Sequence, residues 1–521
     1  MFSRTRLAIA ASVATLALAN PALAADCSAL ATMMLENGSI TAATLVEAGK
    51  FTPPASPPGA PPGAGAGPYA NLPAFCRVEA TLTPTPDSVI KVEVWLPTED
   101  WNGKYVGIGN GIWAGRLSLS QLGSPLSRGY AAATTDTGHS GSGLTAEWAA
   151  GHPEKLVDFG HRAVHLMTVT AKQAIATYYS KPAEVSFWDS CSTGGRQGLM
   201  SAYRYPEDYD AISAMAPANP MTDLMTQSMW ANWVNKRKEG AQLAPATLGL
   251  VHQAVLQQCD MLDGLEDNLI GQPEACSFEP AALVCAAGVS ENCLSAPQAE
   301  AMQALYDGVR GSDGTQLLPG WPRGAEMQLT ALVMGPTPFS VAMSYFQQLV
   351  HGANAAWDWT QMDYANEATA ARDYGAAILN VTADGMDPFF ARGGKLLLSH
   401  GWNDGLIPAG NTLAFYGELT NTLATATAES QLRLFMVPGM EHCGGGEGPN
   451  NFDTLGTLDA WVTSGKAPER IMATRVGSAM PNAPQLPPMS RPLCPYPQIA
   501  RHDGGTDTAD AASFSCALPQ E

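Results

Sequence analysis

A short serine-containing segment has the residue types of a catalytic nucleophile. Ser192 lies in the sequence Ser-Cys-Ser-Thr-Gly-Gly at 190–195, between a predicted strand that ends at Trp188 and a predicted helix that follows at once. A sharp turn from strand to helix lifts one side chain above a sheet, and it needs small neighbours two residues on either side. Ser190 and Gly194 meet that need, although a serine replaces the usual first glycine. We therefore predict a nucleophile elbow with Ser192 at its tip; an ordinary turn with an ordinary serine is the alternative.

Two further segments carry the partners that a serine nucleophile requires. Asp404 ends the sequence His-Gly-Trp-Asn-Asp after a predicted strand at 395–399, and His442 lies in Gly-Met-Glu-His-Cys after a predicted strand at 432–437. The order Ser, Asp, His along the chain, with each residue at the carboxyl end of a strand, is that of the α/β-hydrolase triad. We predict Ser192 as nucleophile, His442 as general base and Asp404 as the residue that orients the histidine.

Other histidines compete for the role of the base. His161 and His165 lie four residues apart on one helix face, where packing is a simpler explanation than a metal pair because no third ligand is evident. His139 follows a plausible strand and could line the site. His400 is expected to be buried and hydrogen-bonded near the predicted aspartate. His442 is preferred because of the cysteine that follows it.

Each of the two predicted catalytic residues has a cysteine as its neighbour. Cys191 directly precedes Ser192, and Cys443 directly follows His442. A disulfide holds two Cα atoms about 5.5 to 6 Å apart, and neighbouring Cα atoms are about 3.8 Å apart. A bridge between these cysteines would hold the serine and histidine near enough for a hydrogen bond. It would also answer the rival hypothesis that Cys191 is the nucleophile, because an oxidised cysteine has no thiolate.

Backbone amides near the elbow are candidates for stabilising an oxyanion. The N–H of Thr193 follows the nucleophile, close to the predicted N-terminus of a helix. The glycine-rich loop at 109–112, after a predicted strand at 105–108, is a second source of donors, and Gly111 is our candidate. An ordinary turn is the alternative for this loop.

The N-terminal residues have the pattern of a secretory signal. Arg4 and Arg6 precede an apolar run at 7–18, and Ala-Leu-Ala at 22–24 has the small-x-small pattern of a cleavage site. We expect residues 1–24 to be removed and the protein to be secreted or periplasmic. The apolar run is too short to span a bilayer, and no later stretch reaches about 18 uninterrupted apolar residues, so no membrane anchor is expected.

Acidic residues dominate the charged part of the sequence. The chain has 28 lysines and arginines against 48 aspartates and glutamates. Loss of the signal would remove Arg4 and Arg6, which leaves 26 basic residues and a net charge of −22. A surface this acidic repels phosphate backbones, so nucleic acid is not an expected partner.

All ten cysteines lie after the predicted signal, and an even number in an oxidising compartment favours disulfides. No pair has the CxxC spacing, which disfavours structural zinc. The sequence alone leaves the connectivity open, although the close pairs Cys259/Cys276 and Cys285/Cys293 suggest local loops.

Strands alternate with helices in two parts of the chain, which is typical of a parallel, doubly wound sheet. We predict an α/β-hydrolase fold of this kind, with a core at 25–217 and 391–521. Because 521 residues exceed what one core usually holds, we expect a large inserted lid domain at 218–390, whose tryptophans mostly form its own core. The strands are expected at 89–96, 105–108, 185–188, 211–216, 395–399 and 432–437, and the helices at 158–179, 195–203 and 455–462. A Pro/Gly/Ala-rich surface loop is expected at 52–68.

Three motifs resemble those of the tannase and feruloyl esterase family, which includes MHETase-like esterases. They are Cys-Ser-Thr-Gly-Gly-Arg-Gln-Gly at 191–198, His-Gly-Trp-x-Asp at 400–404 and Gly-Met-Glu-His-Cys at 439–443. The resemblance runs from about residue 75 to the C-terminus. It implies an α/β-hydrolase fold, the cysteine-linked triad, a calcium-bearing lid domain and five disulfides. The implied pairs are Cys27/Cys76, Cys191/Cys443, Cys259/Cys276, Cys285/Cys293 and Cys494/Cys516.

The same resemblance implies a structural calcium ion in the acidic loop at 260–269. Three carboxylates at spacings of three and four, with a glycine to bend the chain, can turn their oxygens toward one hard cation. On spacing alone, a solvated acidic loop is equally expected. The implied ligands are the side chains of Asp260, Asp263 and Asp267 and the carbonyl groups of Leu265 and Leu269.

The resemblance also implies the substrate class. We expect a secreted serine carboxylesterase that acts on hydroxycinnamate or gallate esters, or related plant-polymer-derived substrates, most simply a feruloyl esterase. A tannase and an MHETase-like esterase are the alternatives, and no lid arginine, whether Arg310, Arg323 or Arg372, could be aligned with a terephthalate-binding role. No redox or nucleotide cofactor is required. An inactive hydrolase fold used for binding is the alternative from another class, and the intact Ser, His and Asp set argues against it.

Overall fold

The computed structural model describes residues 26–54, 69–475 and 486–519. The predicted signal at 1–24 and most of the predicted loop at 52–68 lie outside these residues. Among the described helices, none is long and apolar enough to cross a membrane.

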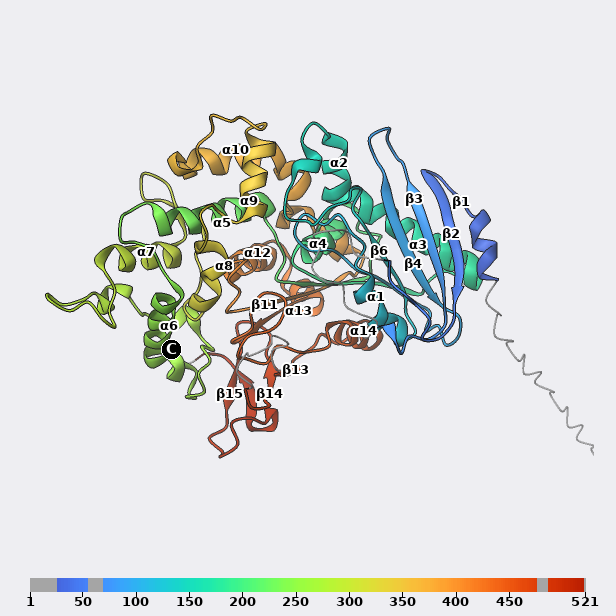
Figure 1. The fold of residues 1–521 in the computed structure, drawn as a ribbon. Coiled ribbons are helices and arrows are strands. Elements are labelled where there is room, and N and C mark those ends of the chain that lie inside the picture. Colours follow the sequence, from blue (N-terminus) through green and yellow to red (C-terminus); the bar gives the residue numbers. More distant parts are fainter. Residues whose placement is uncertain (1–25, 55–68, 476–485, 520–521) are drawn as a thin grey trace, which may run out of the picture.

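Ten strands form one central sheet, in the order β1-β2-β3-β4-β6-β5-β7-β8-β11-β12 (Figure 1). Neighbouring strands from β6 to β12 run parallel, whereas β1 to β4 and the pair β4/β6 are antiparallel. The strands are β1 (Met34–Leu35), β2 (Gly38–Val46), β3 (Phe75–Leu82), β4 (Ile90–Pro97), β5 (Lys104–Gly107), β6 (Ala131–Thr135), β7 (Val185–Cys191), β8 (Ala211–Met215), β11 (Lys395–Gly401) and β12 (Leu432–Val437).

Helices cover both faces of the parallel part of this sheet. Successive side chains of a strand point to opposite faces. Accordingly, Leu396 and Leu398 of β11 pack with α3, α4 and α12, and Leu397 packs in a separate cluster with α1 and α14. The predicted doubly wound α/β-hydrolase architecture is confirmed. These helices are α1 (Leu119–Ser127), α3 (Ala163–Tyr179), α4 (Thr193–Arg204), α12 (Ala409–Thr422) and α14 (Thr454–Ser464); α2 (Pro153–Val157) and α13 (Thr425–Gln431) are shorter.

The chain between β8 and β11 adds no strand to the central sheet. This inserted segment supplies most of one buried cluster, which includes Trp230 and Trp321 and is shared with residues before β7 such as Trp113 and Phe159; Trp233, Trp357 and Trp359 are partly buried against it. Its elements are α5 (Met221–Lys236), α6 (Pro245–Cys259), α7 (Ala296–Asp307), β9 (Val309–Arg310), β10 (Gln316–Leu318), α8 (Thr330–Val333), α9 (Ser340–Ser344), α10 (Tyr364–Leu379) and α11 (Asp387–Ala391).

The C-terminal residues form two small antiparallel ribbons beside the sheet. They consist of β13 (Ile471–Thr474) with β14 (Ser490–Leu493), and of β15 (Ile499–His502) with β16 (Phe514–Ala517). All ten cysteines are paired, in the five pairs that the family resemblance implies.

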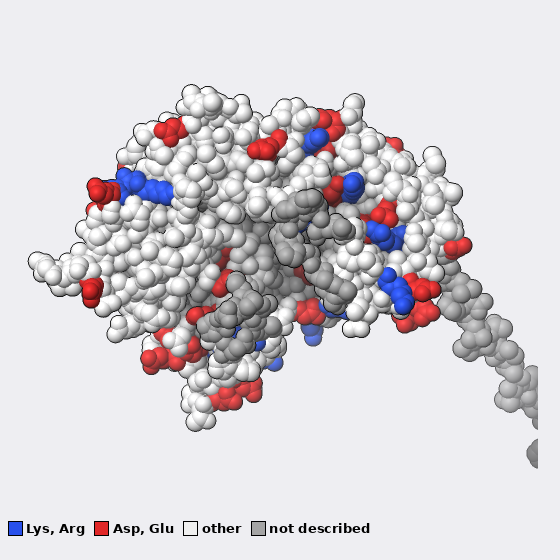
Figure 2. Space-filling view, in the orientation of Figure 1, with Lys and Arg blue, Asp and Glu red and all other residues white. Residues whose placement is uncertain are grey.

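On the face shown in Figure 2, acidic and basic side chains of the described residues are scattered over a mostly uncharged surface, and the lysines and arginines are separated from one another by white and red side chains. The described residues of that face offer no extended basic surface to a phosphate backbone.

Candidate active site

Ser192 stands at a sharp turn between β7 and α4. Its backbone has φ 63° and ψ −127°, a conformation that non-glycine residues adopt only when the surroundings impose it. A Cβ atom at position 194 would lie 2.1 Å from the Oγ atom of Ser190, so only glycine fits there. The turn therefore has the geometry of the predicted elbow, and its second small neighbour is sterically required.

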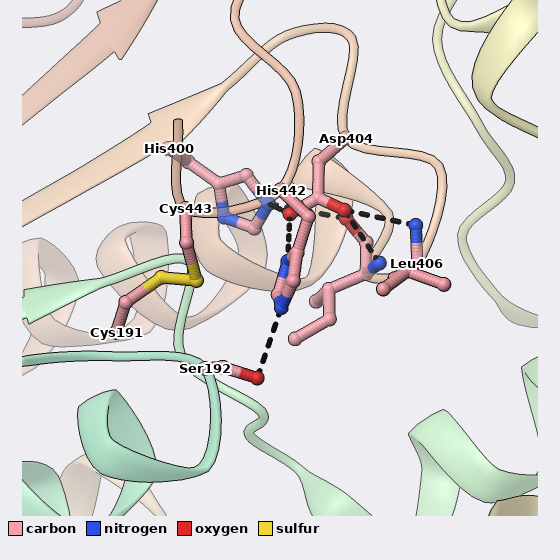
Figure 3. Close-up of a disulfide and its surroundings, with 8 residues drawn as sticks. Cys191, Ser192, His400, Asp404, Leu406, His442 and Cys443 are labelled. Atoms are coloured by element: carbon pink, nitrogen blue, oxygen red, sulfur yellow. Dashed lines mark hydrogen bonds and ion pairs between the residues drawn. A yellow bond between two sulfur atoms is a disulfide. The ribbon is translucent and has the colours of Figure 1, made fainter. Parts of the chain in front are cut away.

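Ser192, His442 and Asp404 are joined by two hydrogen bonds (Figure 3). The Nε2 atom of His442 lies 2.9 Å from Ser192 Oγ, and its Nδ1 atom lies 2.7 Å from Asp404 Oδ2. The other carboxylate oxygen, Oδ1, accepts the backbone N–H groups of Leu406 and Ile407, each at 2.9 Å. The structure thus brings together the three residues that the strand-end motifs predict.

The charges of this arrangement are coupled. Burial alone would raise the pKa of Asp404, but the attraction and hydrogen bonds of His442 and His400 outweigh it, and the pKa falls below its ordinary value. Burial likewise disfavours the charged form of His442, yet the nearby Asp404 carboxylate outweighs it and raises the histidine pKa. The pair is therefore a carboxylate beside an imidazole of increased basicity.

His400 has a structural environment, as expected. It is fully buried, with Nδ1 2.7 Å from Thr412 Oγ1 and Nε2 3.1 Å from the carbonyl oxygen of Ile407. Its Nε2 atom also lies 3.3 Å from Asp404 Oδ2. Both ring nitrogens are engaged away from Ser192, so His400 supports the aspartate and leaves the base position to His442.

The other histidine candidates have different partners. His161 Nδ1 lies 2.8 Å from Tyr205 Oη, and His165 Nδ1 lies 2.9 Å from Asp208 Oδ2. His139 is stacked on an indole ring at 3.7 Å between centroids, and burial lowers its pKa to about 4. None of these contacts involves the triad.

A disulfide links the elbow to the histidine loop. Cys191 and Cys443 are bonded, with their Cα atoms 5.8 Å apart. Figure 3 shows the bridge beside the Ser192–His442 hydrogen bond. The positional prediction of this pair is confirmed, and in this oxidised state Cys191 has no thiol with which to attack a substrate.

The elbow also contacts the glycine-rich loop after β5. Thr193 is buried, and as the first residue of α4 it has an N–H group that its own helix cannot satisfy. Its hydroxyl donates to the carbonyl oxygen of Ile112 at 2.7 Å. The N–H of Asn110 donates to Gln197 Oε1 at 3.0 Å and is therefore not free to bind a substrate oxygen. Gly111 is exposed, and a Cβ atom added there would meet none of the described atoms within 4 Å. Thr193 and Gly111 as oxyanion donors stay a prediction that this geometry permits.

Comparison with known proteins decides the family. A family model described as tannase and feruloyl esterase matches residues 76–517. The chain belongs to the tannase and feruloyl esterase family. It is 32% identical over 536 residues to an uncharacterized esterase from Xanthomonas campestris pv. campestris, which covers 94% of this chain and 91% of that protein.

Fungal relatives of the same family are also similar. A probable feruloyl esterase B-1 from Aspergillus flavus is 30% identical over 460 residues, or 85% of this chain and 86% of that protein. The crystal structure of feruloyl esterase B from Aspergillus oryzae superposes with a TM-score of 0.83 at 26% identity, and it covers 94% of this chain and 99% of the other.

In this member of the tannase and feruloyl esterase family, the acidic loop at 260–269 is held by its own carboxylates. Asp260 accepts the N–H groups of Asp267 at 3.2 Å and Asn268 at 2.8 Å, and Asp263 accepts the N–H of Leu265 at 3.0 Å. Burial raises the pKa of Asp263 to about 7, and the charges of Asp267 and Asp260 add to the rise. Three mutually repelling, largely buried carboxylates are a donor set that fits a hard cation.

Two further features bear on that fit. Within the described part of the chain, the carbonyl groups of Leu265 and Leu269 accept no hydrogen bond, so both are available as ligands. Asp267 Oδ2, however, accepts a hydrogen bond from Arg491 at 2.9 Å. Across residues 26–54, 69–475 and 486–519, no group of three or more His, Cys, Asp or Glu side chains is gathered as a preformed metal site.

Residues of the inserted segment that contact the triad loops were missed from the sequence. Gln328 donates to Glu441 Oε1 at 2.7 Å, next to His442, and Trp321 Nε1 donates to the carbonyl oxygen of Gly405 at 3.1 Å, next to Asp404. No local signal marks these residues, because their partners lie 84 and 113 positions away.

Proposed function

We propose that this protein is a serine carboxylesterase that hydrolyses esters of aromatic acids, with feruloyl esters as the first candidate substrates. The observation that carries the proposal is the hydrogen-bonded chain from Ser192 through His442 to Asp404, beside the Cys191–Cys443 bridge. Its place in a chain that belongs to the tannase and feruloyl esterase family supports the aromatic substrate class.

The mechanism follows from the positions of these atoms. His442 takes the proton of Ser192 through Nε2, and Oγ attacks the ester carbonyl carbon. The negative oxygen that forms is stabilised by the N–H of Thr193 and by a second donor, for which Gly111 is our candidate. His442 then protonates the departing alcohol. Water, deprotonated by the same histidine, hydrolyses the acyl-enzyme and releases the acid.

Three of the four arginines of the inserted segment have contacts that favour an ester without a second carboxylate; the fourth, Arg237, lies over the ring of Trp233. Arg372 is paired with Asp223 at 2.6 Å, and Arg323 donates to the carbonyl oxygen of Phe278 at 2.7 Å. Arg310 donates to a backbone carbonyl at 2.9 Å. Because each has a protein partner, none is a ready ligand for the free carboxylate of a terephthalate monoester. Comparing methyl ferulate, methyl gallate and such a monoester tests this preference; fastest turnover of the monoester would contradict it.

Replacement of the nucleophile tests the activity itself. Ser192→Ala should lower kcat on methyl ferulate by about 10⁴ to 10⁶, because the attacking oxygen is removed. Ser399→Ala is a control for the loss of a serine hydroxyl, since Ser399 is buried in β11 and its hydroxyl has no hydrogen-bond partner among the described residues. Retention of more than about a tenth of wild-type turnover in Ser192→Ala would refute the assignment.

The inserted segment is proposed as a lid with a structural calcium ion. Its contacts with the triad loops through Gln328 and Trp321 support a covering role. The side chains of Asp260, Asp263 and Asp267, with the carbonyl groups of Leu265 and Leu269, would hold the ion. When bound, Ca²⁺ would neutralise these carboxylates and tie the loop together.

We also propose that the protein is secreted or periplasmic. Five disulfides are typical of an oxidising compartment.

A further inference from the structure

The inserted segment contains a cavity of about 920 Å³ that none of the triad residues lines. Its walls come from the C-terminal half of α5, from α7 and from the start of α10. In Figure 1 these helices lie in the inserted segment, on the side of the molecule opposite β1 to β3. A volume of this size is in the range of ligand-binding clefts.

One wall of the cavity is aromatic. The rings of Trp230 and Trp233 are stacked with centroids 5.3 Å apart, and Tyr364 packs against both, at 4.9 and 5.2 Å. Trp230 and Tyr364 are buried, whereas Trp233 is partly exposed. Both indole N–H groups donate to backbone carbonyls. The pair therefore lines the cavity with aromatic rings, and the guanidinium of Arg237 lies over the Trp233 ring, 5.2 Å from its centroid.

Polar side chains also line the cavity. Gln303 donates to Asp307 at 2.8 Å, and its Oε1 atom is buried without a hydrogen-bond partner among the described residues. The hydroxyl oxygen of Tyr364 is likewise buried without a hydrogen-bond partner among the described residues. Buried polar atoms are normally satisfied, so each of these two atoms has the capacity for a further hydrogen bond.

The charges around the cavity select against an anion. Four carboxylates and two guanidinium groups line it, and Lys238, which pairs with Glu300, brings the formal balance to −1: Glu279, Glu300, Asp307, Asp363, Arg237, Arg310 and Lys238. An aromatic carboxylate, such as the acid released by ester hydrolysis, would meet this surplus of negative charge. A neutral ligand that offers both apolar faces and hydroxyl groups matches the aromatic wall and the amide and carboxylate groups.

The cavity is separate from the catalytic centre. The N-terminal end of α5 is near the nucleophile, since the N–H of Ala218 donates to the carbonyl oxygen of Ser192 at 3.0 Å. Trp233 lies twelve residues after Met221, the first residue of α5, or about 18 Å farther along the helix axis. A ligand could occupy the cavity while Ser192 stays accessible.

We propose that this cavity is a second, non-catalytic binding site for a neutral oligosaccharide. The hydrophobic C–H face of a sugar ring would pack against Trp233 beside Arg237, and its hydroxyl groups would bond to Gln303 and Asp307. The proposal deepens the proposed function, because such a site would hold the saccharide part of a sugar-linked aromatic ester. It would raise the local concentration of ester bonds at Ser192 without contact with the reacting atoms.

Calorimetric titration of the full chain with xylohexaose, cellohexaose and maltohexaose tests the site. At least one of these hexasaccharides should bind, and Trp233→Ala should raise the Kd for that sugar by about tenfold or more. Ala281→Arg, a bulky change at an exposed position on the cavity wall, should do the same without removing a packed side chain. Trp101→Ala should bind normally. It is a matched control, since Trp101 is also a partly buried tryptophan stacked on an aromatic ring, with Lys181 over its face.

Hydrolysis of methyl ferulate, which carries no sugar, should be unchanged in Trp233→Ala and Ala281→Arg. The proposal is overturned if no hexasaccharide binds at up to about 10 mM, or if binding survives both cavity variants. Trp233-dependent binding of ferulate alone would overturn it as well. These titrations use unesterified sugars, so saccharide binding without esterase activity would refute the proposed function and leave this site standing.

Discussion

The contact between Asp404 and His442 determines which imidazole nitrogen faces the nucleophile. Asp404 Oδ2 accepts from Nδ1 at 2.7 Å, which leaves the lone pair of Nε2 directed at Ser192 Oγ, 2.9 Å away. The two backbone N–H groups on Asp404 Oδ1 prevent rotation of the carboxylate. A neutral histidine in this tautomer is ready to act as a base.

Replacing the carboxylate by an amide should disturb this tautomer. In Asp404→Asn the side chain can donate to Nδ1, which places the imidazole proton on Nε2, where it blocks acceptance of the serine proton. We expect kcat on methyl ferulate to fall by about 10⁴ while the fold is kept. Asp384→Asn, at an exposed position, is the control. An active Asp404→Asn enzyme would show that another residue orients His442.

The pH dependence of activity should report the pKa of His442. The base must be neutral, and Asp404 raises the histidine pKa above the ordinary value of 6.5. Activity should therefore be present above this raised pKa and be lost as the pH falls through it, so the acid limb of kcat/KM should have a midpoint above 6.5. Residual activity of Asp404→Asn should show this limb at lower pH. A wild-type midpoint below 6.5 would contradict the coupling.

At the scale of elements, the acidic loop at 260–269 directly follows α6 and contacts the C-terminal ribbons. The Cys259–Cys276 bridge closes it, and Asp267 reaches Arg491 on β14. Burial and the neighbouring carboxylates raise the pKa values of Asp263 and Asp267, so a bound cation would favour the ionised forms of both side chains.

Removal of calcium should destabilise the protein before it affects the chemistry. A ligand that binds only the folded state stabilises it by mass action, so exhaustive EDTA treatment should lower Tm, and added Ca²⁺ should restore it. Activity should weaken only as the inserted segment loosens. In Asp260→Asn/Asp263→Asn, EDTA should no longer shift Tm. An unchanged melting curve of the wild type, with no metal by elemental analysis, would remove the site.

At the scale of the whole molecule, one disulfide joins the two halves of the hydrolase core across the insertion. Cys191 and Cys443 are 252 residues apart, and the entire inserted segment lies between them in the sequence. In the chain-entropy model such a link restrains the unfolded chain by about 5 kcal/mol, although measured effects are often smaller. A stabilising role alone would not require this bridge to lie next to the triad.

Removal of this bridge should therefore affect kcat. In Cys191→Ala/Cys443→Ala, we expect a loss of about 10²-fold or more on methyl ferulate, because a displacement near 1 Å can have that effect. Circular dichroism would establish that the protein is still folded. Cys285→Ala/Cys293→Ala removes a local bridge of the inserted segment and should keep normal kcat. A folded Cys191→Ala/Cys443→Ala enzyme with near-normal kcat would show that the loops hold their geometry unaided.

The catalytic residues could be predicted from the sequence because their signals are local. An elbow depends on small residues within two positions of Ser192, and the motifs that end at Asp404 and contain His442 directly follow apolar strands. The strands β11 and β12 were therefore placed to within two residues. Because Cys191 and Cys443 are neighbours of Ser192 and His442 in the sequence, they also predicted one long-range contact, the disulfide between the two catalytic loops.

Other features depended on the tertiary structure. The antiparallel strand β2 was missed because it has no regular alternation of buried and exposed residues. The strand β3 was missed although its residues do alternate, so its pattern could have been read from the sequence. The contact of Gln328 with Glu441 and the cavity beside Trp233 unite residues from separate helices and loops. A sequence states which side chains are available, but contacts over a hundred positions exist only once packing has fixed where each helix and loop lies.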